Sequence, residues 1–306
     1  MPKSDLCPIC QSVAVQNVIK EWPNYRLLQC EACGVGHADP FQAADADWYA
    51  TFLVYESGFD EKYPLDWRHR KFLSLKLPLP SSPGLLDVGC GTGNFIKAAQ
   101  DHGFIVQGLD FEPARAEFGK EHYNVPIEIS TLKDHLKMGA WGKYDVVTFF
   151  EFLEHLDNPV DFIQDVKSAL RPHGLIGLSV PNAERSADLS DRIGDYPPHH
   201  LTWWTRDSLY GFLKQNGFDD IQIYEEPFDL RRVLFLKIKT GLGRAATRLI
   251  AGTPSREGKR RQVLVARLTR GTKNTILSVA TPAGLIAGAL FKLQGIGLLA
   301  VARKVT

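Results

Sequence analysis

Four cysteines near the N-terminus have the spacing of metal ligands. Cys7 and Cys10 form one C-x-x-C pair, and Cys30 and Cys33 form a second pair after 19 intervening residues. Two thiolates on one tight turn can bind an ion from the same side, and two such turns complete a closed four-thiolate site. We therefore predict a structural Zn²⁺ in a ribbon over residues 1–40, with an oxidised pair or chance clustering as the alternative.

A glycine-rich loop between a strand and a helix is the second candidate site. Residues 84–88 form a short apolar run, and a helix is expected from about residue 94. Gly89, Gly91 and Gly93 lie between them, so a ligand can approach the backbone where the helix N-terminus presents free N–H groups. The pattern predicts a ligand site, and a loop that only packs the helix on the sheet is the simpler alternative.

Two acidic residues strengthen the ligand-binding interpretation. Asp87 precedes the first glycine, and Asp110 follows Gly93 by 17 residues at the end of the next expected strand, where a carboxylate can bind ribose hydroxyls. A nicotinamide-dinucleotide fingerprint needs a third glycine at the position of Asn94 or Ile96, and neither is glycine. A P-loop is excluded because no Gly-Lys-Ser/Thr follows.

The run Leu-Asp-Val-Gly-Cys-Gly-Thr-Gly over residues 86–93 resembles the first motif of class I S-adenosylmethionine-dependent methyltransferases. The resemblance covers roughly residues 45–225 and the last strand. It implies that the loop glycines hold the methionine part of S-adenosylmethionine, that Asp110 binds the ribose and that Phe111 packs on the adenine. The family often has an acidic residue near Thr131, and this chain does not. The further cofactor contacts that the resemblance implies are Thr131, Leu132 and Phe150.

Glu151, Glu154 and His155 follow the apolar run 144–150, the expected fourth strand. Ligands bind at the carboxyl ends of parallel strands, so these side chains are candidates for the reaction centre. The segment resembles the Glu-x-x-Glu-His run of ubiquinone-biosynthesis O-methyltransferases, and in some relatives the matching residues approach a divalent metal. His155 is alternatively a general base, because neutral imidazole accepts a proton near pH 7, or Glu154 and His155 only cap the next helix.

His199 and His200 end a polar loop over residues 182–200. A similar Pro-His-His-Leu run precedes the matching helix in many bacterial methyltransferases, where the loop often lies over the active site. Neighbouring side chains of an extended chain point to opposite sides, so we expect one imidazole to reach the site and favour His200.

Methyl transfer from a sulfonium needs positioning, together with removal of a proton when the acceptor is a hydroxyl or a carbon acid. A cysteine-dependent pyrimidine mechanism is disfavoured because Cys90, the only cysteine outside the ribbon, lies in the glycine-rich loop. A ribbon before a class I domain resembles both deoxysugar C-methyltransferases and some ribosomal-RNA guanine methyltransferases. We predict transfer to oxygen or carbon of a small molecule, saccharide or glycolipid intermediate. RNA methylation and a non-catalytic, cofactor-binding adaptor are the alternatives.

Alternating strands and helices from residue 82 predict an α/β, doubly wound, Rossmann-like sheet. We expect a helical cap or linker over 41–80 and the methyltransferase domain over 81–306, with a helical basic insertion at 231–291. The expected strands are 84–88, 104–109, 127–129, 144–150, 175–180, 220–224 and 297–302, and the expected helices are 94–102, 113–122, 159–170 and 206–216.

The segment 231–273 carries thirteen basic residues and one acidic residue, against a whole-chain net charge of +1. A solvated insertion is the first interpretation, contact with an anionic membrane surface the second and nucleic-acid binding the third. No apolar run of the signal-peptide type follows Met1. We therefore expect a cytoplasmic protein, with peripheral contact at the inner membrane surface as an option. The oligomeric state is left open.

Overall fold

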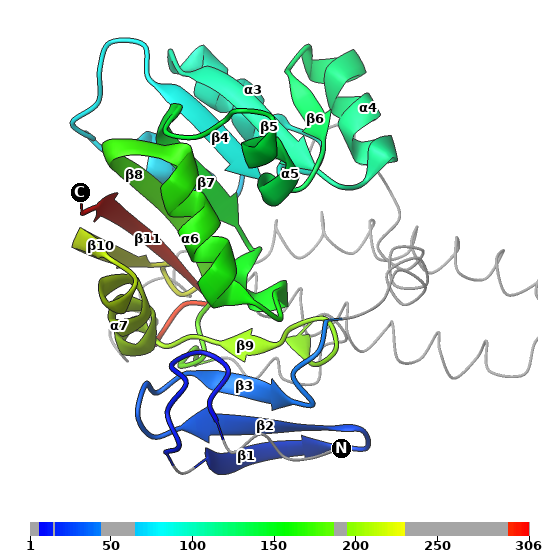
Figure 1. Ribbon diagram of the computed structural model, residues 1–306, viewed down its shortest axis with the longest axis vertical. Helices are drawn as coiled ribbons and strands as arrows, with labels where there is room; N and C mark the ends of the chain where they lie inside the picture. The colour runs from blue at the N-terminus through cyan, green and yellow to red at the C-terminus, as the bar shows by residue number, and fades with distance from the viewer. Residues whose placement is uncertain (1–5, 15, 44–64, 187–194, 230–292, 306) are drawn as a thin grey trace, which may run out of the picture.

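The computed structural model of the 306-residue chain describes residues 6–14, 16–43, 65–186, 195–229 and 293–305. These residues form a four-stranded sheet and a seven-stranded sheet with helices on both faces (Figure 1). The predicted basic insertion at 231–291 and the 44–64 part of the predicted cap lie outside the described residues.

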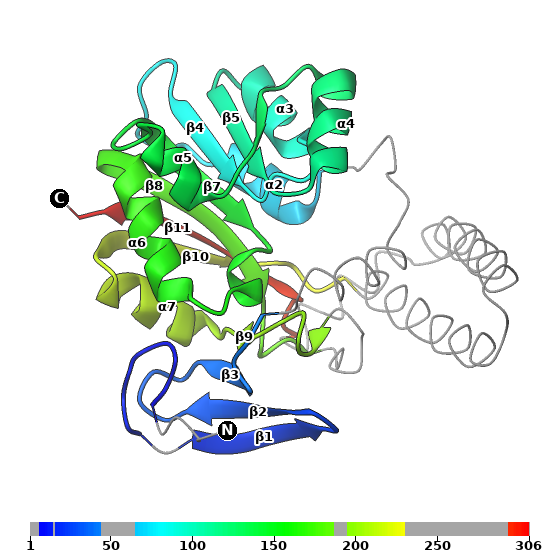
Figure 2. The same cartoon turned by 45° about the vertical axis from the view of Figure 1, so that its right-hand side comes forward.

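The small sheet contains the N-terminal ribbon and one strand from much later in the chain. β1 (Gln16–Trp22), β2 (Tyr25–Cys30) and β3 (Gly36–Asp39) are antiparallel, and a two-residue turn joins β1 to β2. β9 (Thr202–Trp203) pairs with β3 as the fourth strand. Both views place β9 between the ribbon and the large sheet (Figures 1 and 2).

The large sheet has the strand order β10-β11-β8-β7-β4-β5-β6. The pairings from β8 across to β6 are parallel, whereas β11 runs antiparallel to both β8 and β10. This arrangement confirms the predicted α/β class and adds one reversed strand. The strands are β4 (Gly84–Val88), β5 (Ile105–Asp110), β6 (Ile127–Ile129), β7 (Tyr144–Phe150), β8 (Leu170–Pro181), β10 (Phe218–Glu225) and β11 (Gly297–Lys304).

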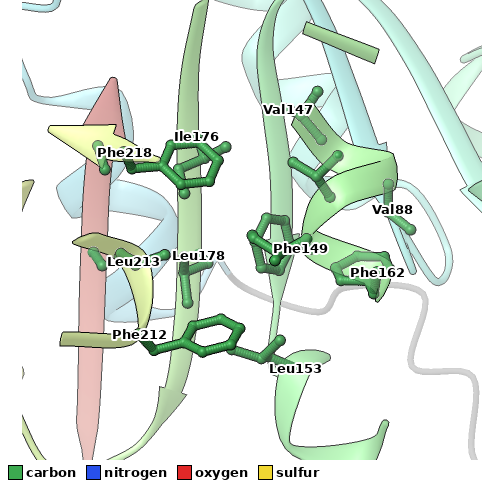
Figure 3. Close-up of a cluster of buried hydrophobic side chains, with 14 of the residues drawn as sticks. Val88, Val147, Phe149, Leu153, Phe162, Ile176, Leu178, Phe212, Leu213 and Phe218 are labelled. Carbon is green, nitrogen blue, oxygen red and sulfur yellow. The ribbon is translucent and has the colours of Figure 1, made fainter. Parts of the chain in front are cut away.

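Each face of the large sheet has its own hydrophobic core. Phe72 of α2 (Trp67–Leu73) and Phe95 of α3 (Asn94–Asp101) belong to one core, with α4 (Pro113–Tyr123) on the same side (Figure 2). α5 (Leu132–Lys137), α6 (Pro159–Ala169) and α7 (Arg206–Gln215) cover the other face, where Phe149, Phe162 and Phe212 pack together (Figure 3). Because both faces are covered, β7 is apolar along most of its length.

Two details differ from the sequence expectations. The helix predicted to run to residue 170 ends at Ala169, and β8 begins at once because Leu170 is extended and pairs with Tyr144. The helix α5 has only six residues, too few for its hydrophobic period to show in the sequence. Among the helices that the structure describes, none has the length and apolar character needed to cross a bilayer.

Candidate functional site

The four cysteines of the ribbon come together in space. Sγ of Cys7 lies 3.8 Å from Sγ of Cys33, and Sγ of Cys10 lies 3.8 Å from Sγ of Cys30. All four sulfurs lie within 4.8 Å of one another, and none is in a disulfide. Gly34, at φ +72°, closes the second turn by donating its N–H to the Cys30 carbonyl. The two turns therefore present four thiols to one point.

The dimensions of this cluster fit a zinc ion. Four thiolates at about 2.3 Å from a tetrahedral Zn²⁺ have sulfur–sulfur edges of about 3.8 Å, which is the separation of the two pairs. The hydrogen bond from Cys33 lowers the pKa of Cys7 to about 4, whereas the same bond raises the pKa of Cys33 and burial raises that of Cys10. A closed set of four ligands leaves no position for a substrate, as expected of a structural ion.

The glycine-rich loop has room for a ligand at one of its three glycines. All three have positive φ: +73° at Gly89, +55° at Gly91 and +78° at Gly93. A Cβ on Gly89 would lie 2.6 Å from the Phe152 ring, and one on Gly93 would lie 2.9 Å from Ile127. A Cβ on Gly91 would meet no described atom within 4 Å. Packing requires the first and third glycines, whereas the second borders open space.

Two carboxyl groups lie at the ends of the neighbouring strands β4 and β5, and one of them, Asp110, contacts Gly91. Asp110 accepts hydrogen bonds from the N–H groups of Gly91 at 2.8 Å and Glu112 at 2.9 Å. Asp87 accepts one from the Thr148 hydroxyl at 2.6 Å. Burial raises the pKa of Asp87 to about 7, and the nearby Asp110 also raises it. Buried carboxyl groups of this kind favour a cationic ligand with hydroxyl groups, and S-adenosylmethionine has both features.

The other residues expected to bind the cofactor have different surroundings. Phe111 is 65% exposed directly after β5, while Leu132 is buried. Thr131 caps α5 and accepts a hydrogen bond from the backbone of its first turn. The ring of Phe150 packs against Phe95, with centroids 4.9 Å apart. Phe111 thus remains a prediction as a cofactor contact, and the Thr131 hydroxyl stabilises a helix end.

His155 lies in η1 (Leu153–His155), the short 3₁₀ helix that follows β7. Its Nδ1 donates to the carbonyl oxygen of His199 at 2.8 Å. Because a carbonyl only accepts, the proton of the neutral ring is on Nδ1 and the lone pair is on Nε2. Burial lowers the pKa of His155, so the ring stays neutral at physiological pH. A neutral imidazole with a defined acceptor nitrogen suits proton removal.

Glu154 is fully buried beside this ring. Among the described residues, neither of its carboxylate oxygens has a hydrogen-bond partner. Oε1 lies 3.8 Å from Nε2 of His155 and 4.0 Å from Nε2 of His200. Burial raises the pKa of Glu154 well above its usual range, and the charge of Glu151 adds to this. The buried carboxyl group can therefore hold a proton between two imidazoles.

Both histidines of the Pro-His-His-Leu segment join this cluster. The ring centroids of His155 and His199 lie 4.3 Å apart, and those of His155 and His200 lie 4.9 Å apart. We expected a single inward ring from an extended chain, but the N–H groups of both histidines donate to the Tyr196 carbonyl in a turn. The turn brings both rings beside His155, and their ligating nitrogens lie within 4.8 Å of one another.

Asp195 and Arg185 complete the surroundings of His200. Oδ1 of Asp195 lies 3.8 Å from Nδ1 of His200, and Asp195 forms a buried ion pair with Arg185. His200 therefore has a carboxylate on its Nδ1 side and Glu154 on its Nε2 side. In the sequence, Asp195 and Arg185 belong only to a polar loop, because their partners are brought close only in the folded chain.

Glu151 has separate partners. Its Oε1 accepts a hydrogen bond from the Ser179 hydroxyl at 3.0 Å and lies 3.3 Å from Nη1 of Arg68. Arg68 comes from α2 and also pairs with Asp66 at 2.8 Å. The structure thus groups Glu154 with the three histidines and holds the Glu151 side chain between α2 and β8. Arg68 was missed because nothing in its local sequence predicts this long-range contact.

Comparison with known proteins agrees with this geometry. The family described as "Methyltransferase domain" matches residues 59–223, more than half of the chain. The ubiquinone biosynthesis O-methyltransferase of Haemophilus ducreyi is 35% identical over 119 residues, 36% of this chain and 50% of that protein. The enzyme of the same name from Coxiella burnetii is 27% identical over 170 residues, 48% of this chain and 71% of that protein. The chain spans about half the length of the first of these curated relatives.

Solved structures share the fold at low sequence identity. Haemonchus contortus phosphoethanolamine N-methyltransferase 2 in complex with S-adenosyl-L-methionine matches with a TM-score of 0.52 at 15% identity, covering 86% of this chain and 58% of that one. The [4+2]-cyclase SpnF matches with a TM-score of 0.50 at 17% identity, covering 78% and 81%. The second match illustrates that the fold alone does not specify the reaction. The extent of the family match is decisive, and this chain belongs to the S-adenosylmethionine-dependent methyltransferase domain family.

Proposed function

We propose that this protein transfers the methyl group of S-adenosylmethionine to an oxygen or a carbon of a small molecule, saccharide or glycolipid intermediate. One observation carries the proposal. The open space at Gly91, next to Asp110, lies at the same edge of the sheet as the buried cluster of Glu154 and the histidines. Cofactor-binding groups and proton-accepting groups thus follow neighbouring parallel strands, β4 and β7.

The cofactor is held by the first of these groups. The carboxylate of Asp110 accepts hydrogen bonds from the ribose hydroxyls, and its fixed position comes from the backbone N–H groups that it already binds. Phe111 covers the adenine, and Gly91 lets the methionine portion approach the backbone. When bound, S-adenosylmethionine supplies the methyl group on its positively charged sulfur.

The acceptor is deprotonated by the second group. His200 or His155 takes the proton from a hydroxyl or a carbon acid, and the carboxylate of Asp195 stabilises the cation that forms on His200. Asp195 orients His200 through its Nδ1. The amount of deprotonation required depends on the acceptor, so a carbon acid relies on this cluster more than a phenol does.

A divalent cation is the second candidate role for the same cluster. The buried Glu154 carboxyl, without a hydrogen-bond partner among the described residues, supports it, as does the closeness of three imidazoles. The test adds one equivalent of zinc to metal-free protein, which is enough to occupy the four-cysteine site alone. A requirement for a further equivalent of metal for turnover supports the cation, and full turnover without it supports the proton-acceptor role.

The test of the proposed function uses purified protein and methyl-labelled S-adenosylmethionine. A lysate of the source organism is separated into small molecules, lipids, polysaccharide, RNA and protein, and each fraction is incubated with the enzyme. Asp110→Ala is the control. We expect label in the small-molecule, lipid or polysaccharide fraction from the wild type alone. Label in RNA overturns the acceptor class, and no label in any fraction despite cofactor binding supports the adaptor alternative.

A further inference from the structure

The loop that carries the paired histidines is held by the N-terminal ribbon through its backbone. β9 begins two residues after His200 and pairs with β3 of the ribbon. Between them, the Leu201 carbonyl accepts a hydrogen bond from the Ala38 N–H at 2.9 Å. The Leu201 N–H donates to the Glu154 carbonyl at 2.7 Å. One buried residue therefore joins the ribbon to the η1 turn.

Aromatic side chains make a second connection between the ribbon and this loop. The ring of Trp22, at the end of β1, stacks on Tyr196 with centroids 6.0 Å apart and an interplanar angle of 24°. It also stacks on Trp203 of β9 at 6.3 Å and 22°. The Tyr196 carbonyl accepts the N–H groups of the two histidines that follow it. Trp22 thus contacts the chain on both sides of those histidines.

The third connection is the hydrophobic core. Cys7, Cys30 and Val35 belong to the same buried cluster as Trp204 and Phe212. Where β3 meets β9 the backbones are so close that a Cβ on Gly36 would lie 3.1 Å from Cβ of Trp203. The packing leaves little room for β9 to move independently of the ribbon. A well-ordered cysteine site therefore restrains the position of the histidine loop.

We propose that the four-cysteine ribbon is a positioning element of the reaction centre: zinc binding and the pairing of β3 with β9 fix His199 and His200 against Glu154 and His155, and so set turnover without setting cofactor affinity. This rests on the proposed function for its catalytic readout. Nε2 of His200 lies 4.0 Å from Glu154 and its Nδ1 lies 3.8 Å from Asp195. Both separations exceed hydrogen-bond length, so a shift of His200 by about 1 Å toward either carboxyl group is enough to form a hydrogen bond.

The cofactor site lies apart from these connections. Gly89–Gly93 and Asp110 belong to β5 and the loop between β4 and α3, and among the described residues no hydrogen bond joins the ribbon to them. Loss of ribbon order therefore lowers kcat while the dissociation constant of S-adenosylmethionine stays the same. General destabilisation, in contrast, lowers kcat and also weakens S-adenosylmethionine binding.

The first experiment compares full-length protein before and after zinc removal with a chelator, and after zinc is restored. Imidazole ¹H–¹⁵N spectra report the histidine cluster, and calorimetry reports S-adenosylmethionine affinity. We expect the signals of His155, His199 and His200 to shift, cofactor affinity to remain within about twofold and kcat to fall by about 10- to 100-fold. Zinc restores all of them. Chelated protein with unchanged imidazole spectra and full turnover overturns the proposal.

Substitutions separate positioning from zinc binding. Gly36→Ala crowds the contact between β3 and β9, so that Trp203 must move by about a few tenths of an ångström, and Trp22→Ala removes the stacking; neither change replaces a cysteine. We expect normal zinc content and cofactor affinity with reduced kcat, and recovery in Trp22→Phe. Gly211→Ala on α7, with no described atom within 4 Å of the new Cβ, is the matched control. Unchanged kcat and imidazole spectra in both test variants contradict the proposal.

The spectra also separate this inference from the proposed function. If wild-type protein transfers no methyl group to any fraction but its imidazole signals still respond to zinc, the positioning role stands and the function fails. If methyl transfer is found and neither the signals nor kcat respond to zinc, the function stands and the positioning role fails.

Discussion

The cofactor loop and the histidine cluster are both at the carboxyl edge of the large sheet, yet they are built in different ways. Gly89, Gly91 and Gly93 lie within five consecutive residues, and Asp110 comes from the adjacent strand. The cluster of Glu154 and the histidines needs η1, a loop before β9 and a ribbon from the start of the chain. A local motif is a property of a segment, whereas an assembled cluster is a property of the fold.

The difference has consequences for how each site fails. In the cofactor loop, backbone conformation and buried carboxyl groups carry the binding, so damage there changes affinity. In the histidine cluster, distances of 3.8 to 4.0 Å between titratable groups carry the chemistry, and the approach of His200 to Glu154 depends on two separate segments, so damage there changes turnover. A variant that changes both cofactor affinity and turnover contradicts this distinction between the two sites. A variant that changes only one of them supports it.

The largest effect is expected at His200. We predict that His200→Ala lowers kcat by about 100- to 1,000-fold, since general base catalysis is worth this much, while S-adenosylmethionine binds as tightly as before. Steady-state kinetics with a labelled acceptor and calorimetry of cofactor binding measure the two quantities. His155→Ala is the companion variant, and the larger loss identifies the base. Wild-type turnover in both excludes proton removal by this cluster.

The second prediction concerns Asp110, where a substitution is expected to change cofactor affinity. Asp110→Ala removes the acceptor for the ribose and for the N–H groups of Gly91 and Glu112. We expect the dissociation constant of S-adenosylmethionine to rise by about 30- to 150-fold, because hydrogen bonds to a carboxylate contribute about 2 to 3 kcal/mol. Calorimetry measures the dissociation constant. We expect the value for Asp110→Asn, which keeps a hydrogen-bond acceptor, to fall between those of the wild type and the alanine variant. Unchanged affinity in the alanine variant removes Asp110 from the cofactor site.

A glycine pair tests which part of the loop is packing and which part is ligand space. Gly93→Ala places a methyl group 2.9 Å from buried side chains at φ +78°, so we expect a loss of about 2 to 3 kcal/mol in unfolding free energy. Gly91→Ala meets open space, so only the backbone strain of about 1 kcal/mol applies. Its cofactor affinity falls more than its stability. Urea unfolding and calorimetry compare the two, and equal stability losses contradict the assignment.

The pKa of Asp87 predicts a pH dependence of stability. Burial raises it from 3.8 to about 7, so between these values the folded protein binds more protons than the unfolded chain. The stabilisation is complete below pH 4 and is lost as pH rises through 7, with a slope of at most about 1.4 kcal/mol per pH unit. Asp87→Asn should flatten this slope in urea unfolding measured from pH 4 to 8. An unchanged slope places Asp87 in contact with water.

How much the sequence could predict follows from the same contrast. The cysteine pairs, the glycine loop and the strands at 127–129 and 144–150 are local patterns, and the structure has them where they were expected. Arg68, Arg185 and Asp195 lie in segments without a motif, and their roles depend on partners far along the chain. The pairing of β9 with the ribbon has no sequence signal either, because two residues are too few to show alternation.

Thr131 gives the smallest expected effect and a direct test of where the family resemblance stops. The resemblance places this residue against the adenine, but its hydroxyl accepts a hydrogen bond from the Asp134 N–H and donates to the Asp134 carboxylate at 2.8 Å. We predict that Thr131→Ala costs about 1 kcal/mol of unfolding free energy, as the loss of a helix N-cap does, and leaves cofactor affinity within twofold. Thr131→Ser keeps the cap and should retain both properties. If the alanine variant binds S-adenosylmethionine tenfold more weakly, the hydroxyl turns from the helix to the ligand when the cofactor binds, and the cofactor site extends to the end of β6.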